Sequence, residues 1–267
     1  MEKKAAPLIP PFRIADNLYW VGVKSMAPAH LMKTADGLVL IDSGSDDTVD
    51  ALISNIESLG FDVKDIKHII HSHGHYDHTG ATPKIVSLSG AKTYIGLGDE
   101  DAVRGECDLL WAGKIPPANE KEYYFEPDVI VREGDVLDFG DVKVRFISTP
   151  GHTVGTMSMF WNVRYKGEEY IAGMFGGAGD NSLTDKYLDS KKLPYSLRED
   201  YIRSTNRLMK EQVDLHIGNH PGNNNHVDKA SRMTEEYNPF IEEKTWIPFL
   251  TKRKNEVMEL YGLEDVE

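Results

Sequence analysis

Short apolar runs bounded by turn residues dominate the first half of the chain. Such runs, rich in β-branched side chains, are typical of buried strands, whereas apolar residues at helical spacing predict helices. The sequence predicts strands over residues 18–23, 30–33, 38–41, 66–70 and 91–95, and helices over 49–59 and 82–88. Asp36-Gly37 is a strong hairpin-turn signal before the third strand. The strand–helix–strand order from residue 38 to residue 70 favours parallel pairing and an α/β fold.

The second half of the chain repeats this order, with strands first and helices afterwards. Strands are predicted over 129–131, 136–139, 142–147, 156–161, 169–172 and 213–217, and helices over 198–210 and most of 226–262, interrupted at Pro239 and Pro248. Residues 97–127 are interpreted as a long loop with room for one helix, and 181–196 as a surface loop. We expect one domain over residues 1–267, compatible with two similar layers. The segment 236–267 is expected to form a helical extension that packs on the body, covers the active-site mouth or makes a dimer contact.

The charge of the chain narrows the classes of partner. The formal net charge of −13 disfavours nucleic acid and anionic membrane surfaces, so a small-molecule substrate is expected and a homodimer is left open. The one cysteine, Cys107, excludes an internal disulfide framework and is interpreted as inert. No apolar run follows the charged amino terminus, so a cytoplasmic protein is expected as the chain is written. A periplasmic or secreted protein is expected if a signal peptide has been removed.

The candidate chemistry lies directly after the apolar strand at 66–70, in His73-Gly74-His75-Tyr76-Asp77-His78. Three imidazoles and a carboxylate at a strand end are costly to bury without partners. Neutral histidine and ionised aspartate are ligands that zinc prefers, so a bound divalent cation removes this cost. A register that starts at His71 puts no carboxylate at the required position. His71 is therefore interpreted as a strand residue or as a support for the site.

Two other strand ends also present histidine, namely His152 in Pro150-Gly151-His152-Thr153 and His220 in Asn219-His220-Pro221-Gly222. These five histidines and Asp77 are enough ligands for two ions, with three ligands each. We predict His73, His75 and His152 on one ion, and Asp77, His78 and His220 on the other. Two zinc ions about 3.5–4 Å apart would activate a shared water and polarise a carbonyl, which is the chemistry of hydrolysis. Asp77 is the predicted catalytic residue, placed to orient the hydroxide and carry a proton, whereas His216 and His226 are interpreted as non-ligands.

These motifs resemble those of the metallo-β-lactamase superfamily. The matching segments are His73 to His78, Thr149-Pro150-Gly151-His152-Thr153, His220 and Leu40-Ile41-Asp42-Ser43-Gly44. Within the superfamily, the chain is most similar to subclass B3. The segments that support this similarity are residues 36–42, Pro116-Pro117-Ala118-Asn119, Asn219-His220-Pro221-Gly222 and the predicted helix at 197–209. The resemblance implies a four-layer αββα sandwich with two zinc ions at one edge, and with Asp42 supporting the site from behind the ligands. It also implies a zinc-dependent hydrolase whose metal-bound hydroxide attacks a cyclic amide, as in a B3-like β-lactamase; a lactonase or thioesterase is the alternative.

The predicted substrate pocket departs from the B3 pattern. B3 enzymes typically have Ala-Asp-Ser after the strand that here ends near residue 172, and the serine helps to hold the substrate carboxylate. This chain has Ala172-Gly173-Met174 instead. Met174 is therefore expected to make the pocket more apolar. Asn181 or Ser182, after the glycine-rich run 173–180, is expected to replace the missing anchor.

Two further expectations concern the mouth of the site and the metal. Tyr187 and Tyr195 are expected in a loop over the site, where they either donate a hydrogen bond to the reacting group or cover apolar surface. An iron-dependent redox member of the superfamily is the alternative of another class. Di-iron members carry glutamate where this chain has His75, which argues against that alternative. The complete ligand set argues against a regulatory protein with a dead site.

Overall fold

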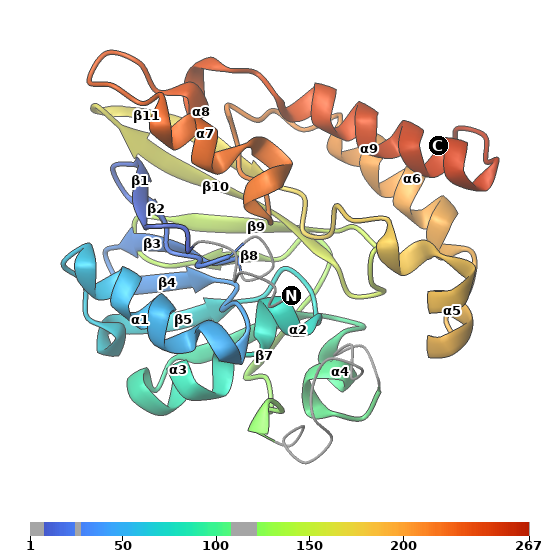
Figure 1. Ribbon diagram of the computed structural model, residues 1–267, viewed down its shortest axis with the longest axis horizontal. Helices are drawn as coiled ribbons and strands as arrows, with labels where there is room; N and C mark the ends of the chain where they lie inside the picture. The colour runs from blue at the N-terminus through green and yellow to red at the C-terminus, as the bar shows by residue number, and fades with distance from the viewer. Residues whose placement is uncertain (1–7, 25–27, 108–121, 267) are drawn as a thin grey trace, which may run out of the picture.

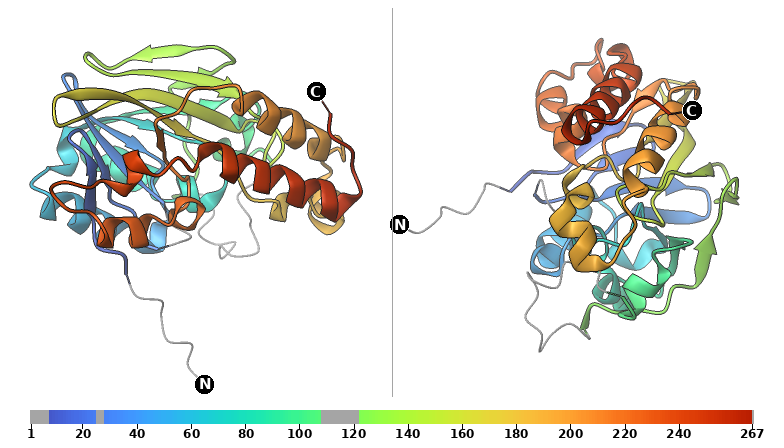
Figure 2. Two further views of the ribbon diagram at one scale, coloured as in Figure 1. Left: turned by 90° about the horizontal axis from the view of Figure 1, so that it is seen from above. Right: turned by 90° about the vertical axis from the view of Figure 1, so that its right-hand side faces the viewer.

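The computed structural model describes residues 8–24, 28–107 and 122–266, and within them two β-sheets lie face to face (Figures 1 and 2). The first sheet has the strand order β1-β2-β3-β4-β5-β6-β7. Its strands are β1 (Phe12–Ala15), β2 (Leu18–Trp20), β3 (His30–Thr34), β4 (Gly37–Ile41), β5 (Ile66–Ile70), β6 (Lys92–Gly96) and β7 (Val129–Val131). The strands from β1 to β4 pair antiparallel, and those from β4 to β7 pair parallel, as the strand–helix–strand pattern predicts.

The second sheet has the order β12-β11-β10-β9-β8. Its strands are β8 (Val136–Asp138), β9 (Lys143–Ser148), β10 (Met157–Tyr165), β11 (Glu168–Met174) and β12 (Leu215–His216). The pairs from β8 to β11 are antiparallel, and β12 adds in parallel to β11. The hairpin of β10 and β11 is longer than the sequence predicts, because the register continues without interruption from Met159 opposite Met174 to Tyr165 opposite Glu168.

Helices cover the outer face of each sheet. The described helices are α1 (Val49–Ser58), α2 (Tyr76–Thr79), α3 (Thr82–Ser89), α4 (Glu100–Arg104), α5 (Asp185–Lys191), α6 (Leu197–Leu208), α7 (His226–Ser231), α8 (Pro239–Glu242) and α9 (Trp246–Tyr261). Apolar side chains of α1 and α3 pack on the first sheet, and those of α5, α6 and α9 pack on the second. Figure 1 shows α9 running alongside α6. The predicted αββα order of layers is confirmed.

The strand β4 explains why an uninterrupted apolar run predicted a buried strand. Val39 and Ile41 point into the cluster between the two sheets, whereas Leu38 and Leu40 point into the cluster beneath α1 and α3. Alternate residues of a strand face opposite sides, so a strand buried on both faces must be apolar throughout. The end of the neighbouring strand β5 is likewise buried on both faces, with Ile70 between the sheets and Ile69 beneath the helices. The loop that carries the predicted ligands begins at this strand end.

Two predictions about helices are corrected. Residues 181–196 are not a loop throughout, because α5 begins after Thr184, whose hydroxyl accepts a hydrogen bond from the backbone of Tyr187. Leu183, Tyr187 and Leu188 bury one side of this segment, but it is too short for its helical period to stand out in the sequence.

The prediction that Pro248 interrupts a helix is also corrected. Pro248 lies in the first turn of α9, where backbone N–H groups have no intrahelical acceptor.

None of the described helices combines the length and the apolar character that crossing a lipid bilayer requires.

Candidate metal centre

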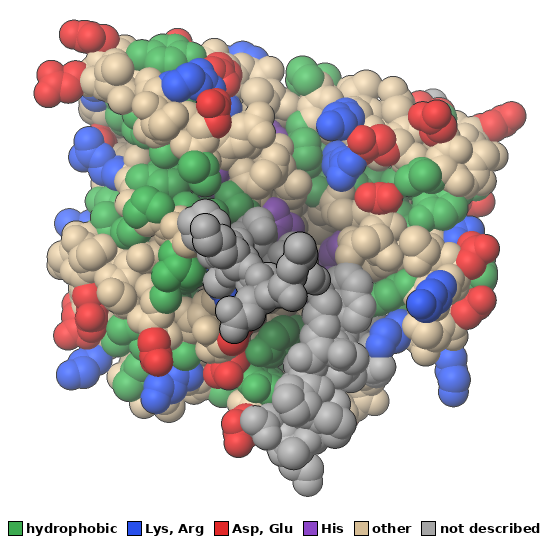
Figure 3. Space-filling model, in the orientation of Figure 1, with side chains coloured by type: hydrophobic (Ala, Val, Ile, Leu, Met, Phe, Trp, Pro, Cys, Tyr) green, Lys and Arg blue, Asp and Glu red, His purple; other side chains and the backbone are tan. Residues whose placement is uncertain are grey.

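Three loops that follow strands carry the predicted ligands to one edge of the two sheets. The loop after β5 carries His73 and His75 and continues into the single turn α2, which presents Asp77 and His78. The loop after β9 carries His152, and the loop after β12 carries His220. Histidine side chains are visible at the bottom of a hollow near the centre of the face shown in Figure 3. Segments far apart in the sequence therefore converge because both sheets end at this edge.

The turn before His152 depends on a glycine. Gly151 has a φ of +145°, and a methyl group at this position would lie 2.6 Å from the Cβ of Tyr201 in α6. Both the backbone conformation and the contact with the helix exclude a larger residue. The turn that the sequence analysis identified thus brings the His152 backbone against α6 and directs the imidazole towards the other two loops.

The first group of potential ligands consists of His73, His75 and His152. The Nε2 atom of His73 lies 3.1 Å from Nδ1 of His75, and that Nδ1 lies 3.0 Å from Nε2 of His152. All three side chains are buried. Nitrogens about 2.0–2.1 Å from one zinc ion at tetrahedral angles would be roughly 3.3 Å apart, close to the spacing observed. The three nitrogens therefore fit a shared cation.

The second group consists of Asp77, His78 and His220. The Nε2 atoms of the two histidines are 3.2 Å apart, and Oδ2 of Asp77 lies 3.7 Å and 3.6 Å from them. His78 is buried, and the other two side chains are partly exposed. Two imidazoles and one carboxylate form a donor set that zinc accepts while leaving room for water or substrate. The structure thus brings all six predicted ligands together, in the two predicted groups of three.

The outward-facing ring nitrogens contact other groups, and this determines which nitrogen of each ring faces the other ligands. His73 Nδ1 donates to the carbonyl of Gly176 at 3.0 Å, and His152 Nδ1 donates to the carbonyl of Gly179 at 2.7 Å. A carbonyl only accepts, so both Nδ1 atoms carry the proton and both Nε2 atoms present lone pairs. His75 Nε2 lies 3.0 Å from the hydroxyl of Tyr187, which leaves Nδ1 facing the group.

The electrostatics of the cluster agree with this proton distribution. Burial lowers the pKa of His78 and of His152 to about 3, and burial lowers the pKa values of His73 and His75 well below the usual range. The mutual repulsion of the imidazolium forms adds to this effect at His73 and His75. The rings are therefore neutral at pH 7, which is the form that binds metal.

Asp42, which the resemblance predicts to support the site, contacts a member of the second group. Its carboxylate accepts hydrogen bonds from His78 Nδ1 at 2.8 Å, from the Ser72 backbone at 2.8 Å and from the Ser72 hydroxyl at 2.9 Å. Burial raises the pKa of Asp42 to about 6, so the group is still ionised at pH 7. Its backbone φ of +58° is rare for a residue other than glycine. Strain of this kind often marks a functional position.

Asp99 is a buried carboxylate beside the first group that the sequence analysis did not identify. It accepts hydrogen bonds from the backbone of Gly74, between two ligands, and from the Thr153 hydroxyl and Gly155 backbone, after the third. Burial raises the pKa of Asp99, and these hydrogen bonds oppose the rise. The residue lies in the stretch 97–127, in which no motif or period distinguished it from other acidic residues.

The two ligand groups lie in one cleft with a volume of about 290 Å³. Its described lining consists of histidines, one aspartate, asparagines and glycines: His73, His75, Asp77, His78, His152, Gly179, Asn181, Asn219, His220, Gly222 and Asn223. Among the described residues that line it there is no lysine or arginine. The described part of the wall therefore carries amide groups and no lysine or arginine charge.

The residues predicted to contact substrate occupy different places. Asn181 lines the cleft, whereas the Ser182 hydroxyl hydrogen-bonds to the His152 carbonyl and orients that residue. Tyr187 is buried and reaches His75 rather than the open cleft. Tyr195 is 45% exposed and donates to Asp189, outside the cleft lining. The tyrosines therefore do not lie over the substrate space as predicted.

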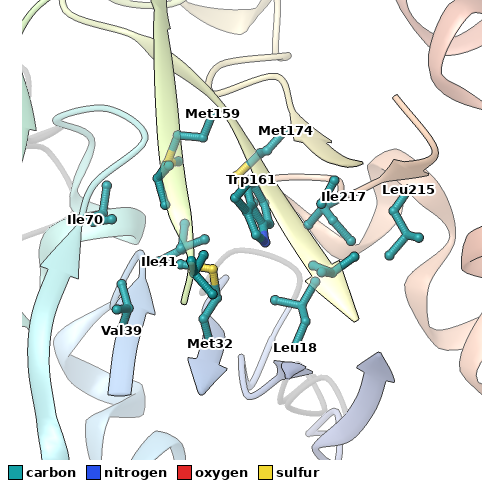
Figure 4. Packing of buried hydrophobic residues seen from close by; sticks show 14 of the residues in the cluster. Leu18, Met32, Val39, Ile41, Ile70, Met159, Trp161, Met174, Leu215 and Ile217 are labelled. Atoms are coloured by element: carbon teal, nitrogen blue, oxygen red, sulfur yellow. The ribbon is translucent and has the colours of Figure 1, made fainter. Parts of the chain in front are cut away.

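The prediction that Met174 lines the pocket is wrong. Its side chain is fully buried in the cluster between the sheets, with Trp161 and Ile217 among its neighbours (Figure 4). Met174 is the last residue of β11, and in the pleat its side chain points to the same face as that of Ala172, into the core.

Replacement of Met174 by serine is accordingly expected to weaken the fold, not to anchor a carboxylate. The lost apolar volume and the buried hydroxyl should together lower the free energy of unfolding by about 2–4 kcal/mol. Denaturant unfolding measures this loss, and KM for a carboxylate-bearing β-lactam should not fall. Asn181→Ala is the matched control, since it should change KM with little loss of stability. A lower KM in Met174→Ser with unchanged stability would restore the original interpretation.

The remaining histidines named in the sequence analysis lie outside both groups. His71 contacts the Thr82 hydroxyl, and His216 contacts that of Thr245. His226 accepts a hydrogen bond from the Gly218 backbone. It begins α7 and is fully buried against Trp20 and Phe240. Cys107 is exposed, and Pro116-Pro117-Ala118-Asn119 lies outside the described residues.

Curated relatives with similar sequences include hydrolases. The chain is 32% identical over 110 residues to a hydroxyacylglutathione hydrolase of Rhodospirillum rubrum, covering 41% of this chain and 33% of the relative. It is 31% identical over 132 residues to a probable metallo-hydrolase of Methanocaldococcus jannaschii, covering 46% and 57% respectively. The chain thus spans between a third and somewhat more than half of the length of these relatives.

Solved structures are similar over nearly the whole chain. BJP-1, a subclass B3 metallo-β-lactamase of Bradyrhizobium japonicum, matches with a TM-score of 0.82 and 26% identity, covering 96% of this chain and 95% of that chain. The native FEZ-1 metallo-β-lactamase from Legionella gormanii matches with a TM-score of 0.80 and 26% identity, covering 97% and 98%. The model of the metallo-β-lactamase superfamily matches residues 24–164, more than half of the sequence. The chain therefore belongs to the metallo-β-lactamase superfamily, and its structure is similar to those of subclass B3 enzymes.

Proposed function

We propose that this protein is a zinc-dependent hydrolase that binds two ions per chain and opens a cyclic amide or an ester. His73, His75 and His152 would hold one ion, and Asp77, His78 and His220 the other. The observation that carries the proposal is the convergence of these two three-ligand groups in one cleft. Zinc bound there would supply a water of lowered pKa and would polarise the substrate carbonyl.

The chain's own contribution is to hold its ligands in place before substrate arrives. Each of His73, His78 and His152 donates its outward N–H to a fixed oxygen, so little reorganisation is needed during the reaction. Asp77 lines the cleft with its carboxylate partly open. It is the proposed catalytic residue, which accepts a hydrogen bond from the attacking water and passes a proton to the leaving group.

The proposed substrate is a small molecule with an activated carbonyl. A β-lactam is the leading candidate, because the similar solved structures BJP-1 and FEZ-1 are metallo-β-lactamases. A lactone or thioester is the alternative, supported by the similarity to a hydroxyacylglutathione hydrolase. Asn181 and Asn223 provide amide groups at the cleft wall that suit hydrogen bonding to a polar acyl group, whereas the amide of Asn219 is bonded to the Gly176 carbonyl and to Asn223.

The test is a parallel assay on one zinc-loaded sample whose metal content has been determined. A chromogenic cephalosporin, an acyl-homoserine lactone and a thioester would be followed side by side. We expect two zinc ions per chain and turnover of the cephalosporin. Turnover of the lactone or thioester alone would favour the alternative substrate class. A protein with two zinc ions that hydrolyses none of the three would contradict the proposed substrates.

His220→Ala is the control for contaminating enzymes, because it removes a ligand that is partly exposed at the cleft. Activity that persists unchanged in this variant would come from another protein or another site. Metal analysis of the protein as purified, before zinc is added, tests the iron-dependent alternative. Stoichiometric iron in that sample would contradict the assignment of zinc.

A further inference from the structure

A single buried carboxylate joins the two loops that carry the first ligand group. Asp99 lies just before α4 and is completely buried. Its Oδ2 accepts from the backbone N–H of Gly74 at 2.7 Å, and Gly74 is the residue between His73 and His75. The same oxygen accepts from the Thr153 hydroxyl at 2.6 Å, directly after His152. All three ligands of the first group are thus next to a residue that Asp99 holds.

The second oxygen of Asp99 extends the connection. Its Oδ1 accepts from the backbone N–H of Gly155 at 2.8 Å. The Thr153 hydroxyl, which donates to Asp99, lies 2.7 Å from the Thr156 hydroxyl, and that hydroxyl accepts from the Thr153 backbone at 3.1 Å. The bonds form a closed network around the His152 loop. Asp99 is the member of this network that reaches across to the His73–His75 loop.

The backbone beside Asp99 is shaped to allow this contact. A methyl group at Gly155 would lie 2.4 Å from the Asp99 backbone nitrogen and 2.7 Å from its Cγ. Real side chains do not approach so closely, so only glycine lets the His152 loop pack against this carboxylate. The contact is therefore built into the loop and does not result from a chance surface arrangement.

We propose that Asp99 is a positioning residue for the first ligand group, setting the spacing of His75 and His152 by binding both loops. The proposal rests on the proposed metal-binding function. It assigns the two buried carboxylates different tasks. Asp42 accepts a hydrogen bond from His78 of the second group, whereas Asp99 accepts hydrogen bonds only beside the ligands of the first group. Each metal group then has a carboxylate of its own behind it.

Asp99→Asn changes this arrangement with almost no change of volume. An amide has one acceptor oxygen, so its NH₂ group must face either the Gly155 N–H or the Gly74 N–H, where donor meets donor. Asp99→Asn therefore loses either the Gly74 bond to the His73–His75 loop or the Gly155 bond to the His152 loop. Loss of a group that orients metal ligands typically costs 10- to 100-fold in metal affinity. We expect a loss of about this size at the first group and less than about threefold at the second.

The experiment measures zinc affinity by competition with a chromophoric chelator, in two backgrounds. His220→Ala leaves only the first group complete, and His152→Ala leaves only the second. Asp99→Asn should weaken binding about 10- to 100-fold in the first background and hardly in the second. Asp42→Asn should show the reverse pattern. Equal losses in both backgrounds, or no loss in either, would overturn the proposal, because a general structural role predicts no selectivity between the groups.

Thr153 variants keep the test decisive if Asp99→Asn fails to fold. Thr153→Val removes the hydroxyl that donates to Asp99, whereas Thr153→Ser retains it. We expect Thr153→Val to weaken the first group and Thr153→Ser to bind zinc within about threefold of the unmodified protein. Equal affinity of the two variants would contradict the proposal. Failure of the unmodified protein to bind zinc would overturn the proposed function instead, so the two failures are distinguishable.

Discussion

Replacement of His78 by alanine is expected to reduce bound zinc from two ions to one per chain and to lower hydrolysis by more than about 100-fold. Loss of a residue that only orients a metal ligand already lowers metal affinity or activity by about 10- to 100-fold. Loss of the ligand itself should leave its group unable to hold an ion. The remaining pair, Asp77 and His220, offers two ligands where three or four are usual. The first group should still bind its ion, because its ligands contact different supports.

Metal analysis of dialysed protein, followed by the hydrolysis assay, measures both effects. His71→Ala is the matched control, because His71 is an equally buried histidine in the same loop region that hydrogen-bonds to Thr82 and belongs to neither group. This control should retain two zinc ions even if it is less stable. Two ions in His78→Ala, or one in His71→Ala, would show that the ligands have been assigned wrongly.

Removal of the metal by a chelator is expected to abolish activity and to lower the melting temperature by roughly 15–30 °C. At free zinc a thousandfold above Kd, binding stabilises the folded state by about 4 kcal/mol per site, or about 8 kcal/mol for two sites. One kcal/mol corresponds to about 2–4 °C for a domain of 150–250 residues. The physical reason is that buried imidazole nitrogens 3.0–3.2 Å apart face one another and need a cation between them.

Thermal unfolding in matched buffers, with and without excess zinc, measures the shift. His78→Ala should show about half of it, because one group remains, and comparison of each protein with its own metal-free form cancels the intrinsic effect of the substitution. Magnesium at the same concentration is a further control, since nitrogen ligands favour zinc. A shift below about 2 °C in the unmodified protein would mean that the cluster is stable without metal.

Local elements and the chemistry attached to them could be predicted from the sequence. Strands such as β4 and β5 could be predicted because burial on both faces demands an apolar run. The ligands His73 to His78 could be identified because their spacing is dense and local, and His152 and His220 because each follows a predicted strand. The division of six ligands into two groups followed from the number of ligands that one ion needs, and the structure brings the side chains together in that division.

The groups behind the ligands and the lining of the cleft could not be predicted, because they depend on how distant segments pack together. Asp99 acts through residues far away in the sequence, so no local pattern distinguishes it from a solvated aspartate. Met174 was expected in the pocket because it matches the position of the substrate-binding serine in B3 enzymes, but the strand continues to that residue and its pleat turns the side chain into the core. Short segments such as α5 are stabilised by the surface on which they pack rather than by their own period. A sequence encodes spacing along the chain, whereas the facing direction of a side chain depends on where strands end and on which loops meet.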